Sequence, residues 1–207
     1  MRRTAVLTAI PLAAASLMLT GAGLVLAPPS AADMPSTTEG QLVRNATLLP
    51  TAEQLPVGAW ARVRSVETGS GKTVVTLQVR GFAAGATYGA HAHYKPCGAA
   101  TAPLASGAHY QNVVDPAVLA SAASLGTDYE TIASVDADYA NPDNEVWLDL
   151  TTDADGNGSA QTVVDWQFRG TTPLLRSVVI HVNHTSHGGT PPAGNAGARL
   201  GCLSATF

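Results

Sequence analysis

Apolar and polar residues alternate along much of the chain with a period of two. Residues 59–64 and 75–80 are two such runs, and residues 67–72, which contain Gly-Ser-Gly, lie between them. Alternation of this kind is typical of half-buried antiparallel strands, and a short glycine-rich segment between two strands predicts a hairpin. Similar runs recur at 146–150, 164–168, 178–182 and 200–207. The pattern predicts an all-β sandwich or barrel of short antiparallel strands.

The segment from His109 to Asn141 breaks this alternation and is rich in alanine and aspartate. Within it, Asp115 precedes Pro116, and Gly126 follows an alanine-rich stretch, which predicts a short helix with Asp115 as its N-cap. A connection of this length inside a compact domain is uncommon and often functional. We therefore expect one long irregular loop on the β domain.

Residues 1–32 have the layout of a secretory signal peptide. Two arginines precede an apolar stretch from residue 5 to 26, and small residues lead to a predicted cleavage after Ala32. An uncleaved membrane anchor is the alternative, because the stretch is nearly long enough to span a bilayer. Residues 33–40 are polar and are expected to form a flexible leader, so that the folded domain spans 41–207. The chain is expected to be secreted or held in the cell envelope, with no membrane contact after cleavage.

Composition narrows the classes of partner. With 45% apolar and 13% charged residues, the chain is not of the disordered type. Without the two N-terminal arginines, nine basic residues stand against fifteen acidic ones, a net charge of −6. No basic run is present, so nucleic acid is not an expected partner. Export places Cys97 and Cys202 outside the reducing cytosol, which favours a disulfide over the alternative of two buried free thiols.

Four histidines lie on or beside the predicted strands. His91 and His93 are two residues apart, so on a strand both rings project from the same face. His109 follows in a Gly-Ala-His-Tyr segment, and His181 lies in the run 178–182. Imidazole ligands suit copper, zinc, iron or nickel. Spacing alone makes a shared metal site a hypothesis, with unconnected histidines as the alternative.

Four segments of the chain resemble the copper/zinc superoxide dismutases, and they occur in that family's order. They are 85–93, 107–110, 178–181 and 194–202. The last one, Gly-Asn-Ala-Gly-Ala-Arg-Leu-Gly-Cys, is the most specific. The resemblance covers nearly all of the chain after the signal peptide. It implies an immunoglobulin-like Greek-key β-barrel or sandwich of about eight antiparallel strands.

The resemblance also implies roles for individual residues. Arg199 matches the arginine that attracts and orients the anion beside the copper ion. Cys97 and Cys202 match the family's intrachain disulfide. The residues at the places of the copper ligands are His91, His93, His109 and His181, of which His109 matches the histidine that also bridges to zinc.

The chain departs from the family at the zinc site. Zinc-containing members supply two further histidines and an aspartate after the bridging histidine, yet no histidine occurs within residues 111–180. Asn141 stands about where the last zinc histidine is expected. Because His109 and one carboxylate cannot complete four-coordinate zinc, we expect a copper-only relative. Asp143 or Glu145 is then expected to accept a hydrogen bond from the outer nitrogen of His109 and to orient its ring.

The function implied by this resemblance is that of a secreted copper-dependent superoxide dismutase, which converts superoxide to dioxygen and hydrogen peroxide. His109 and Arg199 are its expected catalytic residues. A non-enzymatic copper carrier on the same fold is one alternative, and a secreted β-domain without metal is another. His184 and His187 either capture copper at an accessory site or lie solvated in a loop. For the oligomeric state, a monomer and a homodimer are both compatible with the sequence.

Overall fold

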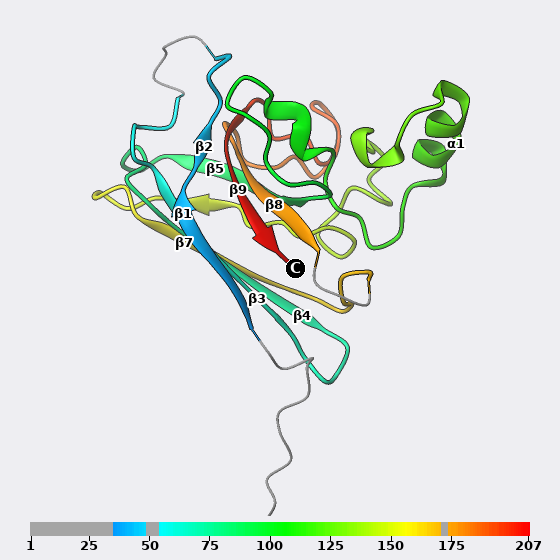
Figure 1. The fold of residues 1–207 in the computed structure, drawn as a ribbon, viewed down its shortest axis with the longest axis horizontal. Coiled ribbons are helices and arrows are strands. Elements are labelled where there is room, and N and C mark those ends of the chain that lie inside the picture. The colour runs from blue at the N-terminus through cyan, green and yellow to red at the C-terminus, as the bar shows by residue number, and fades with distance from the viewer. Residues whose placement is uncertain (1–34, 49–53, 171–173) are drawn as a thin grey trace, which may run out of the picture.

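The computed structural model describes residues 35–48, 54–170 and 174–207, and the predicted signal peptide lies outside these ranges. The described strands form two antiparallel sheets (Figure 1). In spatial order, the first sheet contains β1 (Ser36–Gln41), β3 (Trp60–Glu67), β4 (Thr73–Arg80) and β7 (Gly158–Val164). The second contains β2 (Val43–Arg44), β9 (Arg199–Thr206), β8 (Leu175–His181), β5 (Thr87–His93) and β6 (Leu150–Thr151).

The chain passes repeatedly from one sheet to the other, after β1, β2, β4, β6 and β7. No strand pairing within the described ranges joins the two sheets, so the fold is an immunoglobulin-like sandwich rather than a closed barrel. This confirms the all-β prediction and decides between the two architectures that the sequence left open.

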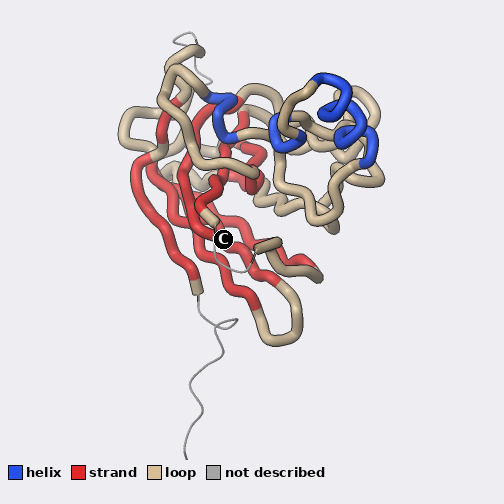
Figure 2. Tube along the Cα trace, turned by 45° about the vertical axis from the view of Figure 1, so that its right-hand side comes forward, coloured by secondary structure: helices blue, strands red, loops and turns tan. Residues whose placement is uncertain are grey.

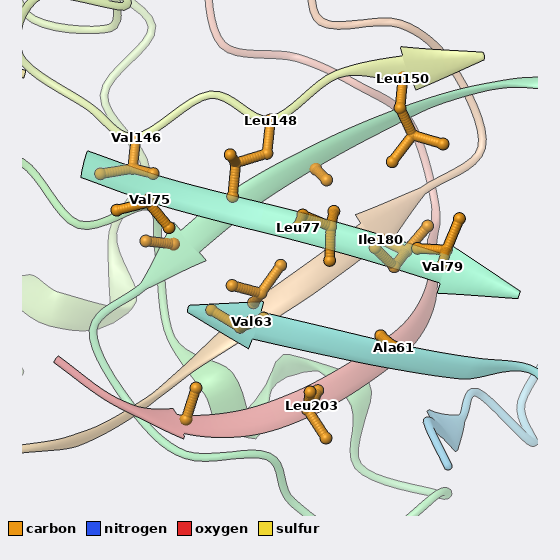
Figure 3. Close-up of a cluster of buried hydrophobic side chains, with 14 of the residues drawn as sticks. Ala61, Val63, Val75, Leu77, Val79, Val146, Leu148, Leu150, Ile180 and Leu203 are labelled. Carbon is orange, nitrogen blue, oxygen red and sulfur yellow. The ribbon is translucent and has the colours of Figure 1, made fainter. Parts of the chain in front are cut away.

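The core lies between the sheets and follows the predicted alternation. Figure 3 shows apolar side chains of β3 and β4 facing those of the opposite sheet and of the segment before β6. The labelled residues are Ala61, Val63, Val75, Leu77, Val79, Val146, Leu148, Leu150, Ile180 and Leu203. The loss of apolar surface from water at this interface is the main force that holds the two layers together.

Two expectations about strands were wrong in part. Residues 36–40, expected as part of a flexible leader, belong to β1. This polar strand lies at the edge of its sheet and pairs with β3, from Ser36 opposite Ser65 to Gln41 opposite Trp60. The domain therefore starts before residue 41. Backbone hydrogen bonds to β3, rather than a buried apolar face, attach β1 to the sheet.

The run at 164–168 is not a continuous strand either. β7 ends at Val164, and the rings of Trp166 and Phe168 are buried beyond it. Phe168 packs on Tyr110 and Phe207, with ring centroids 4.8 Å apart in both pairs. Burial of alternate aromatic rings thus gives the period-two pattern without strand pairing.

The helix in the long connection is confirmed. α1 (Pro116–Leu125) begins after Asp115, whose carboxylate accepts a hydrogen bond from the Ala117 N–H at 2.7 Å. It ends at Gly126, where φ is 63°, a left-handed value that glycine adopts without strain. The described residues also contain two 3-10 helices, Pro103–Ser106 and Tyr129–Thr131. The helical segments gather at one end of the molecule (Figure 2). Of the helices described, none has the length and apolar character needed to cross a membrane.

A disulfide joins Cys97, in the loop after β5, to Cys202 on β9. Its Cα atoms are 5.8 Å apart, within the usual range for such a bond. The predicted pairing is therefore present, and it ties the loop that follows the first two histidines to the sheet.

Candidate metal centre

The four histidines lie together beside the five-stranded sheet, on the side away from the core. Ala90 and Ala92 of β5 point into the core, so the alternating His91 and His93 rings point the opposite way. His181 ends β8 next to β5. His109 arrives from the loop and pairs its backbone with His93. One ligand atom from each of the four rings lies within 4.8 Å of all the others.

Three of these rings are oriented by acceptors at their outer nitrogen. His93 Nδ1 lies 2.9 Å from the Gly107 carbonyl, and His181 Nδ1 lies 3.1 Å from the Gly197 carbonyl. His109 Nδ1 lies 2.9 Å from Glu145 Oε2. Since carbonyl and carboxylate oxygens only accept, each Nδ1 carries the proton and each Nε2 is left with a lone pair.

His91 is oriented the other way round. Its Nε2 lies 2.6 Å from the hydroxyl oxygen of Thr185, whereas its Nδ1 is buried and has no hydrogen-bond partner among the described residues. A buried polar nitrogen without a partner is costly unless a ligand meets it. One Nδ1 and three Nε2 atoms therefore converge, which is a donor set suited to a copper or zinc ion.

Burial keeps the imidazoles of His91, His93 and His181 neutral. Desolvation, with smaller contributions from the neighbouring histidines and Arg199, holds the pKa of His91 and of His93 well below the usual value of 6.5. Desolvation also lowers the pKa of His181 to about 3. A neutral imidazole is the form that binds a metal, so the centre is ready for an ion at ordinary pH.

Of the two carboxylates expected beside His109, the structure brings only Glu145 to it. Glu145 is 2% exposed, and its Oε2 accepts hydrogen bonds from His109 and from Trp147 Nε1, at 2.9 and 2.8 Å. Its Oε1 accepts from Gln111 Nε2 at 3.0 Å. Asp143 is exposed, and its backbone N–H donates a hydrogen bond to the side-chain oxygen of Asn141.

Arg199 is held at the edge of the centre by the loop after β5. Its Nη2 donates to the Gly107 carbonyl at 2.7 Å, and its Nη1 donates to the Pro103 carbonyl and the Ser106 hydroxyl. A cavity of about 100 Å³ is lined by His109, Arg199 and the 193–195 loop, among others. The geometry thus places a guanidinium and one histidine on the same small opening.

His184 and His187 lie outside the four-histidine group. The half-exposed His184 ring has its Nδ1 3.0 Å from Asp149 Oδ2. The His187 ring packs edge-on against Trp147, with 5.0 Å between the ring centroids. Each therefore contacts a residue that lies next to the centre.

Sequence reasoning missed several residues that touch the histidines, chiefly Trp147, Asp149 and Thr185. A signal for two of them was present, because Trp147 and Asp149 alternate with the core residues between 146 and 150. The apolar face of this period-two pattern predicts the core, and the opposite face carries these two residues. Thr185 lies in an irregular loop and gives no periodic signal.

No family model matches this chain, and no curated protein matches it in sequence. Among solved structures, the Cu/Zn superoxide dismutase from Brucella abortus is similar to it, with a TM-score of 0.50, 19% identity, and coverage of 83% of this chain and 99% of that one. The clock protein EA4 follows with a TM-score of 0.48, 18% identity, and coverage of 83% and 94%. A double mutant of an SOD-like protein from Bacillus subtilis has a TM-score of 0.42, 17% identity, and coverage of 82% and 96%. The chain has the fold of the copper/zinc superoxide dismutases.

Proposed function

We propose that this protein is a secreted, copper-dependent superoxide dismutase without a zinc ion. The observation that carries the proposal is the convergence of four imidazoles, with the unpaired Nδ1 of His91 among them, beside the guanidinium of Arg199. Copper(II) binds nitrogen donors more tightly than the other divalent first-row metals. The disulfide fits a location outside the cytosol, in agreement with a signal peptide at 1–32.

The side chains have separate tasks in this proposal. Copper, when bound, supplies the one-electron exchange by which one superoxide is oxidised and another reduced. Hydrogen bonds to Gly107 and Gly197 hold two ligand rings in place, and burial keeps those rings neutral. Arg199 offers a positive charge to an anion that the net negative chain repels.

Glu145 accepts a hydrogen bond from the outer nitrogen of His109, so that nitrogen is not free to bind a zinc ion. Three donors converge on its buried carboxylate, from His109, Trp147 and Gln111. The four-histidine cluster is the one group of three or more metal-binding side chains found in the described part of the chain. We therefore infer that Glu145 orients His109 in place of zinc.

A copper carrier on the same fold is the second candidate. The observation in its favour is the burial of His91 and His93, which are both 0% exposed. A carrier can hold copper with every coordination position filled, whereas an enzyme keeps one position open for superoxide.

Metal content tests the ligand set. Protein purified with copper and zinc both present should hold about one copper ion per chain and negligible zinc, because four imidazoles serve one ion and residues 35–48, 54–170 and 174–207 contain no second complete set. Elemental analysis measures both metals, with His91→Ala as the copper-deficient control. Stoichiometric zinc beside copper would contradict the proposal.

Superoxide decay tests the activity. The copper-loaded protein should accelerate decay in proportion to its copper content, and His91→Ala should abolish the effect because a ligand atom is lost. Azide should also change the copper absorption spectrum if a coordination position is open. Full copper loading with no acceleration and no azide response would favour the carrier.

Arg199→Ala should lower the rate constant for superoxide by roughly tenfold or more at low ionic strength, and it should flatten the salt dependence, because the local positive charge is removed. Stopped-flow decay at several salt concentrations measures both. Arg64→Ala, on the exposed face of β3, removes the same charge far from the centre and is the matched control. Equal effects of the two variants would argue against guidance by Arg199.

The stability of the metal-free protein should fall as the pH is lowered. The pKa values of His91, His93 and His181 are lowered in the folded state, so below about pH 6.5 the unfolded chain binds more protons. This contribution is complete above pH 6.5 and is lost on acidification, by up to about 1.4 kcal/mol per pH unit for each histidine. Chemical unfolding from pH 8 to 4 should give a steeper decline for the wild type than for His181→Gln. Identical slopes would show that the buried imidazole contributes nothing.

A further inference from the structure

The acceptor at His91 differs in kind from those at the other three ligands. A carbonyl or carboxylate oxygen faces the outer nitrogen of His93, His181 and His109, and these groups have no proton to give. His91 instead meets the hydroxyl of Thr185, which is able to donate or to accept. The hydroxyl alone therefore does not decide which nitrogen of His91 carries the proton.

Asp149 determines the direction of the Thr185 hydroxyl proton. Its Oδ1 lies 2.6 Å from Thr185 Oγ1 and also accepts from the Ala90 N–H at 3.1 Å. Its Oδ2 accepts from the Thr185 N–H at 2.8 Å. The hydroxyl has a single proton, which goes to the carboxylate, so its lone pairs are left for His91 Nε2–H at 2.6 Å. His91 Nδ1 is then without a proton, which accounts for its lack of a partner.

The position of Thr185 is fixed by close packing against β5. A Cβ atom at Gly89 would lie 2.5 Å from the Asn183 carbonyl oxygen and 3.1 Å from Thr185 Oγ1, so only glycine lets this loop approach. Thr185 is 3% exposed. On the solvent side, His184 Nδ1 contacts the second carboxylate oxygen of Asp149 at 3.0 Å.

We propose that Thr185 and Asp149 are a positioning pair that sets the tautomer of His91 and so presents its Nδ1 to the metal. The consequence for copper rests on the proposed function, whereas the tautomer is a property of the metal-free chain. Without the hydroxyl, Asp149 Oδ1, which lies 4.0 Å from His91 Nε2, is beyond hydrogen-bond distance, so the buried Nε2–H loses its acceptor and the proton is no longer confined to that nitrogen. Groups that orient a ligand histidine in this way affect metal affinity by roughly 10- to 100-fold.

The test compares Thr185→Val with Thr185→Ser, which restores the hydroxyl. Long-range proton–nitrogen NMR of the metal-free protein reports which nitrogen of His91 is protonated, and competition with a chelator reports copper affinity. The wild type and Thr185→Ser should show a single Nε2–H tautomer. Thr185→Val should lose that uniform state and bind copper about 10- to 100-fold more weakly.

Thr152→Val is the matched control, because Thr152 is also a buried threonine whose hydroxyl bonds to backbone groups, at Ala83 and Ala86. It should leave the tautomer and the copper affinity unchanged. An Nδ1–H signal for His91 in the wild type would overturn the proposal without any variant. Equal affinity losses in Thr152→Val and Thr185→Val would overturn it as well.

These measurements can reject the positioning pair and the dismutase function independently of each other. Loss of the tautomer and of copper affinity in Thr185→Val, together with no superoxide activity in the loaded wild type, would support the positioning pair and reject the dismutase. A uniform Nε2–H state in Thr185→Val, with wild-type affinity and activity, would reject the pair and leave the dismutase standing.

Discussion

The alternation of side chains on β5 is the constraint on which the metal centre depends. Ala90 and Ala92 pack into the sandwich core, and this fixes His91 and His93 on the other side of the strand. On β8 the same rule sends Ile180 inward and His181 outward. The apolar packing that stabilises the fold therefore also fixes the ligand geometry, and core and centre are two faces of one sheet.

Imidazoles on an open sheet face would be hydrated, so the covering loops supply the rest of the chemistry. The Gly107 carbonyl accepts from both His93 and Arg199, which couples a ligand to the proposed anion guide through one oxygen atom. The disulfide from Cys97 to Cys202 anchors the same loop to β9. A rigid attachment of this loop keeps ligand and guanidinium at a constant separation, as a preorganised site requires.

Much of this could be predicted from the sequence, because strand periodicity, the helix cap at Asp115 and the histidine pair are local signals. The edge strand β1 escaped prediction because it buries no apolar face. Asp143 and Glu145 could not be separated, since residues two apart share the same alternation, and only the turn at Asn141 directs Asp143 outward. Contacts such as Thr185 with His91 join distant segments, and no local pattern encodes them.

The order of the ligands along the polypeptide has a consequence for biogenesis. A nascent chain emerging from the ribosome completes the β3–β4 hairpin and β5 long before β8, which carries His181, has been made. Until β8 pairs with β5, at most three of the four imidazoles are available. The loop after β8, which contains Thr185, has not yet covered them. The proposed ion can therefore meet all four imidazoles only after β8 has been made, and a prematurely terminated chain would lack one of them.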